Sequence, residues 1–151
     1  MSSDTVDVLN DLIKTCNDGL KGFKTAAHDI KREDLRQVLL AGARRCEDGA
    51  AELAVLVRAL GGEPASGGSA AGALHRGWVE VKSSVMPNTD LAIMEECERG
   101  EDSAKKSYKQ ALEKTLPPEV RVVVERQYSG VLENHNRVHA LRDSLREAAH
   151  A

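Results

Sequence analysis

The sequence predicts an all-α protein, an up-down bundle of four long helices with a long crossover between the second and the third. Apolar residues recur at alternating spacings of three and four along four segments, as in helices that bury one face in a bundle. No segment has the alternating pattern of a half-buried strand. One stretch rich in glycine and serine, GGEPASGGSAAG at 61–72, divides the helical segments into two pairs. We therefore expect a single domain with hairpins at 5–61 and 89–150 and a crossover at 62–88.

The first hairpin is expected to hold two antiparallel helices joined by a short turn near IKRED, at 30–34. Its first helix, roughly 5–31, carries on one face Val6, Leu9, Ile13, Cys16, Leu20, Phe23, Ala27 and Ile30. Its second helix carries on one face Leu35, Leu39, Gly42, Cys46, Gly49, Leu53, Leu56 and Leu60. Gly61 and Gly62 then end the second helix, because glycine readily adopts the left-handed conformation that follows a helix.

The crossover and the second hairpin follow from the same pattern. Ser69 is a suitable N-cap for a shorter helix in the crossover, and Trp78 would anchor that helix on the bundle. The third long helix, roughly 89–116, carries on one face Met94, Cys97, Glu101, Ala104, Tyr108 and Ala111. Pro117 and Pro118 break it and start the fourth helix, which runs from about 119 to 150. The fourth helix carries on one face Val124, Tyr128, Val131, His135, Val138 and Leu145.

Composition and cysteine usage argue against several classes of function. The net charge is -3 with both signs mixed along the chain, so no basic surface for nucleic acid is predicted. The first residues have neither a basic flank nor a long apolar run, so neither a secretion signal nor a membrane span is expected. Cys16, Cys46 and Cys97 are an odd number in no zinc-like spacing, which favours a reducing cytoplasm and core packing over disulfides.

The two hairpins align weakly with each other. A shift of 81 residues places Cys16 over Cys97 and Leu20 over Glu101, which suggests a duplicated hairpin. Glu101 thus occupies a position on the buried face that is apolar in the first hairpin. A carboxylate in a bundle core is costly unless it is paired, hydrogen-bonded or bound to a metal. We therefore expect Glu101 to have a partner, and His135 on the fourth helix is the candidate.

Five runs of the sequence resemble one known family. They are DGLKGFKTAAHDIK at 18–31, AAELAVLVRALGGEP at 50–64, AGALHRGW at 71–78, ECERGED at 96–102 and LPPEVRVVVERQ at 116–127. Together they look like an uncharacterised bacterial family of ferritin-like four-helix-bundle proteins, described only as a domain of unknown function. The resemblance covers nearly the whole chain. It implies a ferritin-like bundle with a helical crossover, and it brings no established activity.

The resemblance allows a di-iron site to be tested by position. Ferritin-like di-iron proteins take one Glu from each of two helices and a Glu-x-x-His pair from each of the other two. The corresponding positions are Leu20, Gly49, Glu52, Glu101, Leu132 and His135. Leucine and glycine have no ligating side chain, so half of the positions cannot bind iron and a di-iron ferroxidase is not expected.

The other three positions leave two interpretations open. Glu52, Glu101 and His135 can hold a single divalent ion of iron, manganese or zinc, with Glu98 or His139 nearby. Alternatively, Glu101 and His135 form a buried polar pair without a metal. The third helix also carries an acidic cluster, of which most members are expected to face solvent. The cluster consists of Glu95, Glu96, Glu98, Glu101 and Asp102.

Three hypotheses for function follow. The missing ligands favour a non-enzymatic scaffold or interaction protein with a degenerate di-iron site. The alternative is a metal-binding protein in iron handling or the stress response that uses the Glu52, Glu101 and His135 site. A third hypothesis is a small molecule in the core, where Gly42 and Gly49 leave room. A homodimer is also expected, because the first two helices carry further apolar residues beside their buried faces, Leu12, Val38 and Val57.

Overall fold

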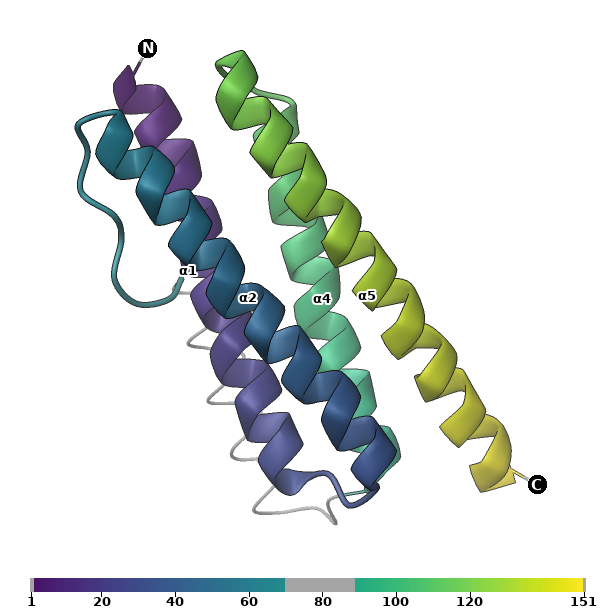
Figure 1. Cartoon of the computed structure of the whole chain (residues 1–151). Helices are drawn as coiled ribbons and strands as arrows, with labels where there is room; N and C mark the ends of the chain where they lie inside the picture. Colours follow the sequence, from purple (N-terminus) through teal and green to yellow (C-terminus); the bar gives the residue numbers. More distant parts are fainter. Residues whose placement is uncertain (1, 70–88, 151) are drawn as a thin grey trace.

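Four long helices form a bundle in this computed structural model, which describes residues 2–69 and 89–150. They are α1 (Ser2–Asp29), α2 (Glu33–Ala59), α4 (Asp90–Leu112) and α5 (Pro118–His150), and the described residues contain no strand. The pairs α1–α2 and α4–α5 form antiparallel hairpins, and α1 packs on α4, whereas α2 and α5 meet at few points (Figure 1). The predicted all-α bundle of two hairpins is confirmed. The predicted crossover helix and Trp78 lie outside the described residues.

The helix ends follow from local capping chemistry. Thr89 caps α4, because its hydroxyl accepts a hydrogen bond from the Ala92 N–H at 3.1 Å. At the end of α2, Gly61 has a φ of 82°, and the Gly62 N–H donates to the Val57 carbonyl at 2.9 Å, which is a Schellman motif. The α4 helix ends at Leu112, four residues earlier than predicted. Proline disfavours the helical conformation at the residue before it, here Leu116, so the turn has to begin before Pro117.

The apolar core consists of two clusters, one toward each end of the bundle. The first joins the start of α1, the end of α2, the end of α4 and the start of α5, and it includes Leu9, Leu12, Leu53, Val57, Val120 and Val124. The second joins the opposite ends of the same helices and includes Phe23, Ile30, Leu35, Leu39, Met94 and Val138. Between the two clusters lie Glu101 and Asn134, which are both buried. The polar residues of the bundle are therefore concentrated near its middle.

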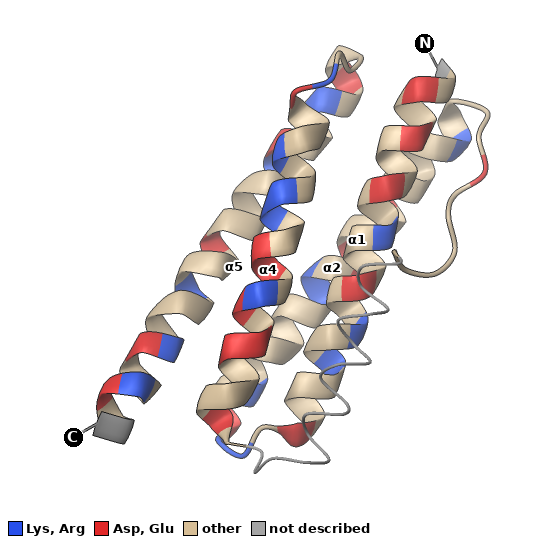
Figure 2. Ribbon diagram, turned by 180° about the vertical axis from the view of Figure 1, so that it is seen from behind, with Lys and Arg blue, Asp and Glu red and all other residues tan. Residues whose placement is uncertain are grey.

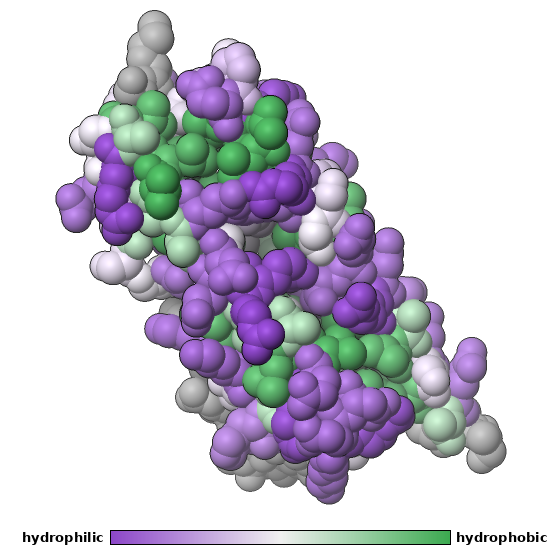
Figure 3. Space-filling view, in the orientation of Figure 1, coloured by the Kyte–Doolittle hydropathy of each residue, from purple (hydrophilic) through white to green (hydrophobic). Residues whose placement is uncertain are grey.

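Two residues offered above for self-association are not at the surface. Leu12 is 1% exposed and Val57 is not exposed at all, because both belong to the intramolecular core. The exposed large apolar side chains among the described residues are Leu40, Val55 and Val122. Figure 3 shows apolar surface on the face that α2 and α5 form. Among the described residues, no helix combines the length and apolar character that crossing a membrane requires.

Candidate metal centre

Carboxylates on α4 and imidazoles on α5 face one another across the second hairpin. Glu98 and Asp102 are four residues apart on α4, and His135 and His139 are four residues apart on α5, so each pair shares one helix face. The Nε2 atom of His135 lies 2.5 Å from Asp102 Oδ1, and the Nδ1 atom of His139 lies 3.1 Å from Glu98 Oε1. The two imidazole rings stack with centroids 6.2 Å apart. The antiparallel packing of α4 and α5 thus brings four potential ligands together.

Three of these residues have the geometry of a metal-binding group. Glu98, Asp102 and His135 each offer one ligand atom, and these atoms all lie within 4.8 Å of one another. The side chains of Glu98 and His135 are mostly buried, whereas that of Asp102 is 58% exposed. The site is therefore held on one side by the hairpin and open to solvent on the other. Two carboxylate oxygens and one imidazole nitrogen suit zinc, manganese or ferrous iron.

The three ligands predicted from sequence do not lie together. His135 belongs to the cluster, but Glu52 accepts a hydrogen bond from Gln127 Nε2 at 2.8 Å and pairs with Arg126. Partial burial raises the pKa of Glu52, but the bonds from Arg126 and Gln127 outweigh it and the pKa is lowered. Glu52 is thus held at the junction of α2 and α5.

Glu101 is buried and bound to a partner that the sequence did not single out. It is 4% exposed, and its Oε2 accepts a hydrogen bond from Asn134 Nδ2, whereas the expected partner His135 binds Asp102 instead. Its Oε1 has no hydrogen-bond partner among the described residues. Burial raises the pKa of Glu101 to about 7, against the opposing effects of Asn134, Arg45 and His135. Both Asn134 and His135 lie at helical spacing from Val131, so the pattern alone could not choose between them.

Protein groups occupy the centre of the bundle, where a di-iron site would lie. The Tyr108 hydroxyl lies 3.3 Å from Cys16 Sγ and donates to Gln127 Oε1 at 2.7 Å, and Gln127 Nε2 also reaches the Gly49 carbonyl at 3.3 Å. Leu20 packs in an apolar cluster. Three of the six ligand positions have no ligating side chain, and Glu52 and Glu101 are already bound by Arg126, Gln127 and Asn134, so the residues of the centre do not fit a di-iron group.

The room expected at two glycines is filled at Gly42, whereas Gly49 borders a cavity. A side chain at Gly42 would lie 3.1 Å from the ring of Phe23, and one at Gly49 would lie 3.4 Å from Cys16 Sγ and 3.6 Å from Gln127. These glycines therefore allow close packing of α1, α2 and α5. Gly49 also lines a cavity of about 1220 Å³ together with Cys16, Glu101 and Tyr108, so the space on which the small-molecule hypothesis rests is present at Gly49 and absent at Gly42.

The expectation that the acidic residues of α4 mostly face solvent is wrong. Glu96 is 6% exposed and pairs with Arg99, and Glu98 pairs with Arg142 of α5 at 3.2 Å. Glu95 lies 3.5 Å from Arg146 of α5. Figure 2 shows mainly acidic positions on the lower half of α4 and both basic and acidic positions on the lower half of α5. Arginines of α5 thus compensate the acidic residues on this face of α4. The sequence shows this complementarity only when the two helices are placed side by side.

The three cysteines are free thiols. Burial raises the pKa of Cys16, raises that of Cys46 to about 11, and raises that of Cys97 further still. Because the thiolate is the reactive form, these thiols are poor nucleophiles at neutral pH. Their placement agrees with the predicted role in packing.

Solved structures with this fold come from several bacteria. The chain is similar to a dodecameric thioferritin, a bacterioferritin-related protein from Bacteroides fragilis, with a TM-score of 0.78, 14% identity, and coverage of 99% of this chain and 90% of that one. It is similar to a ferritin-like diiron-carboxylate protein from Bacillus anthracis, with a TM-score of 0.69, 14% identity, and coverage of 95% and 96%.

A third match is a two-domain protein from Anabaena variabilis with DJ-1/ThiJ/PfpI-like and ferritin-like domains, with a TM-score of 0.78 and 11% identity. The match covers 98% of this chain, which spans 38% of the length of that protein. Identities this low show the ferritin-like fold and no more, and no curated protein matches. The family model described as a domain of unknown function, DUF2383, matches residues 4–114, and the chain belongs to that family.

Proposed function

We propose that this protein binds one divalent metal ion between α4 and α5, at Glu98, Asp102 and His135. The observation that supports the proposal is that three ligand atoms from two helices lie within 4.8 Å of one another. The ion would supply positive charge between two carboxylates of α4, Glu98 and Asp102, which face the imidazole of His135 across the hairpin. Because a single ion without bridging carboxylates lacks the di-iron arrangement, the proposed role is metal binding in iron handling or the stress response, without ferroxidase activity.

The competing function is that of a scaffold without metal. It is favoured by the centre of the bundle, where protein groups satisfy Gln127, Tyr108 and Glu52 without an ion. The two functions differ in one measurable property. A metal that binds only the folded chain raises its stability with metal concentration, whereas a metal-free scaffold has no such dependence.

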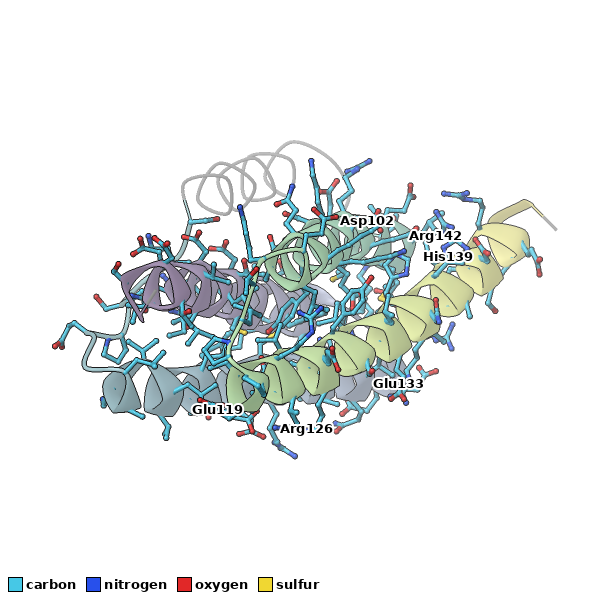
Figure 4. The ribbon with its side chains drawn as sticks, turned by 90° about the horizontal axis from the view of Figure 1, so that it is seen from above. Asp102, Glu119, Arg126, Glu133, His139 and Arg142 are labelled. Carbon is cyan, nitrogen blue, oxygen red and sulfur yellow. The ribbon has the colours of Figure 1, made fainter. Side chains whose placement is uncertain are left out.

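Metal analysis and calorimetric titration test the proposal. The protein is purified without chelator, its metal content is measured, and zinc, manganese and anaerobic ferrous iron are titrated into the apoprotein. His135→Ala and Asp102→Asn should each weaken binding by about tenfold or more, because the first removes an imidazole ligand and the second removes the negative charge of a carboxylate ligand. Glu133→Gln is the matched control, since Glu133 is exposed on α5 and points away from Asp102 and His139 (Figure 4).

Two further variants distinguish this site from the one predicted by sequence. Glu52→Gln and Glu101→Gln should leave metal binding unchanged, because neither residue contributes to the cluster. If these variants lose metal binding and His135→Ala keeps it, the metal site lies at the centre of the bundle instead. Absence of metal, of binding heat and of a thermal shift in the wild type would leave the scaffold as the function.

We also propose that the chain forms a homodimer through the face of α2 and α5. Val55 is 62% exposed and Val122 is 64% exposed, which is costly for apolar side chains in water. Light scattering coupled to size-exclusion chromatography should give twice the chain mass for the wild type and a lower mass for a Val55→Lys, Val122→Lys variant. A monomer mass for the wild type would refute the homodimer.

A further inference from the structure

An arginine lies directly against the proposed metal site. Arg142 Nη1 is 3.2 Å from Glu98 Oε2, and Arg142 Nη2 is 2.9 Å from His139 Nδ1. The Arg142 side chain is only 14% exposed. In Figure 4, Arg142, His139 and Asp102 lie on the same side of the α4–α5 hairpin. The guanidinium therefore contacts one ligand of the site and the imidazole next to it.

Arg142 explains why His139 does not join the ligand group. A guanidinium stays protonated and only donates hydrogen bonds, so in the neutral tautomer with its proton on Nε2, His139 Nδ1 accepts from Arg142 at 2.9 Å. In that tautomer the same nitrogen cannot also donate to Glu98 Oε1, which lies 3.1 Å away. The other nitrogen, Nε2, lies 3.3 Å from Asp143 Oδ2, where its N–H can donate. Both nitrogens of His139 are thus engaged, although this residue is one helical turn from His135 and stacks on it.

The contact between Arg142 and Glu98 is incompletely satisfied. It is an ion pair, but Glu98 Oε2 and Arg142 Nε are buried and neither has a hydrogen-bond partner among the described residues. Buried polar atoms without partners cost free energy in the folded state. A metal ion bound by Glu98 would satisfy the carboxylate and release the arginine. The ion pair between Glu98 and Arg142 therefore stabilises the folded state less than a fully hydrogen-bonded pair with the same burial would.

We propose that Arg142 competes with the metal ion for this site. Its guanidinium holds Glu98 and His139 where a cation would bind, and its displacement adds His139 as a fourth ligand. This inference rests on the proposed metal site and concerns its affinity and ligand number. With Arg142 in place, the site offers two carboxylates and one imidazole. With Arg142 displaced, it offers two carboxylates and two imidazoles, a set that suits zinc. Arg142 thus determines how tightly the site binds.

Zinc titration of Arg142→Gln apoprotein tests the inference. This variant should bind zinc about tenfold more tightly than the wild type or better, because a positive charge next to the ion has been removed. His139→Ala should weaken zinc binding in the Arg142→Gln background and have little effect in the wild-type background, which a double-mutant cycle measures. The matched control is Arg146→Gln, which removes the same charge one turn along α5, where Arg146 lies 3.5 Å from Glu95.

Each outcome decides the question. Unchanged or weaker binding in Arg142→Gln, or an equal gain in Arg146→Gln, would overturn the inference while leaving the proposed metal site intact. Zinc binding by Arg142→Gln but not by the wild type would support the inference and contradict the proposed function of the native chain. If neither the wild type nor Arg142→Gln binds zinc, both the inference and the proposed metal site are refuted.

If circular dichroism shows that Arg142→Gln is unfolded, Arg142→Lys takes its place. A lysine keeps the charge but lacks the planar fork that reaches Glu98 and His139 together. The lysine variant should therefore bind zinc more tightly than the wild type. Wild-type affinity in that variant would overturn the inference.

Discussion

Replacing Glu101 by glutamine should make the stability of the protein less sensitive to pH. Glu101 is 4% exposed, one of its oxygens accepts from Asn134, and the other has no hydrogen-bond partner among the described residues. Burial raises its pKa from 4.5 to about 7. Glutamine has the same shape and can accept the same hydrogen bond from Asn134, but it never ionises. The substitution therefore isolates the cost of the charge.

The magnitude follows from the difference between the folded and unfolded pKa. Each pKa unit corresponds to about 1.4 kcal/mol, so ionising Glu101 in the folded state costs about 3 kcal/mol in total. Because the folded pKa is raised, the folded state holds the proton more tightly than the unfolded state does. Stability is fully present below the unfolded pKa of 4.5 and falls as pH rises toward about 7. Above that range the wild type carries the whole cost.

Urea unfolding of both proteins, in EDTA to exclude metal effects, measures this difference. Glu101→Gln should be more stabilising at about pH 8 than at about pH 5, by roughly 2 kcal/mol. Glu133→Gln is the control, because Glu133 is an exposed residue of the same hairpin and should show no such dependence. An equal effect of Glu101→Gln at both pH values would refute the idea that a buried charge sets the pH dependence.

Two further predictions concern packing in the middle of the bundle, and both are measured by urea unfolding. Tyr108→Phe removes the hydroxyl between Cys16 and Gln127 and should lower the free energy of unfolding by about 1–3 kcal/mol. Tyr128→Phe is the control, and an equally small effect of both substitutions would show that the Tyr108 hydrogen bonds contribute little. Gly19→Ala should destabilise, because its methyl group would lie 2.7 Å from Cys46 Sγ. Gly22→Ala, whose methyl group meets no described atom within 4 Å, should stabilise by about 0.5–1 kcal/mol through helix propensity, and the reverse order would contradict the packing.

The helices could be predicted because their apolar residues recur with helical spacing and their ends carry local signals. Gly61 follows the end of α2 as the sequence indicates, and Thr89, the expected start of the third helix, is the residue that caps α4. The end of α4 was placed four residues too late, because the prediction used Pro117 as the residue that breaks the helix; Leu116 is buried although it lies beyond the helix. Periodicity reports which residues are buried. It does not report whether the backbone that carries them is still helical.

The candidate site was less predictable, because it depends on how two helices are rotated and offset against each other. His135 was identified, but Asp102 was expected at a solvent-facing position, and in the structure the two lie 2.5 Å apart. The pairing of Arg142 with Glu98 joins residues 44 positions apart and has no local signature. Positional transfer from di-iron proteins failed at Glu52, because Arg126 and Gln127 hold that carboxylate at the junction of α2 and α5.

Two adjacent pairs of residues explain why a metal would bind at the edge of the hairpin and not at its centre. Glu101 and Asn134 form the inner pair, and the next residue on each helix, Asp102 and His135, forms the outer pair. One position along a helix turns the side chain by about 100°, which is enough to move it from the core toward solvent. In the core, burial favours the neutral form of Glu101, and the added charge of an ion would have to be desolvated as well. At the edge, Asp102 is 58% exposed, so water can solvate the charges that a divalent ion requires. The bundle thus keeps a polar pair at each place, and only the outer one has the exposure and the ligand atoms to hold a metal.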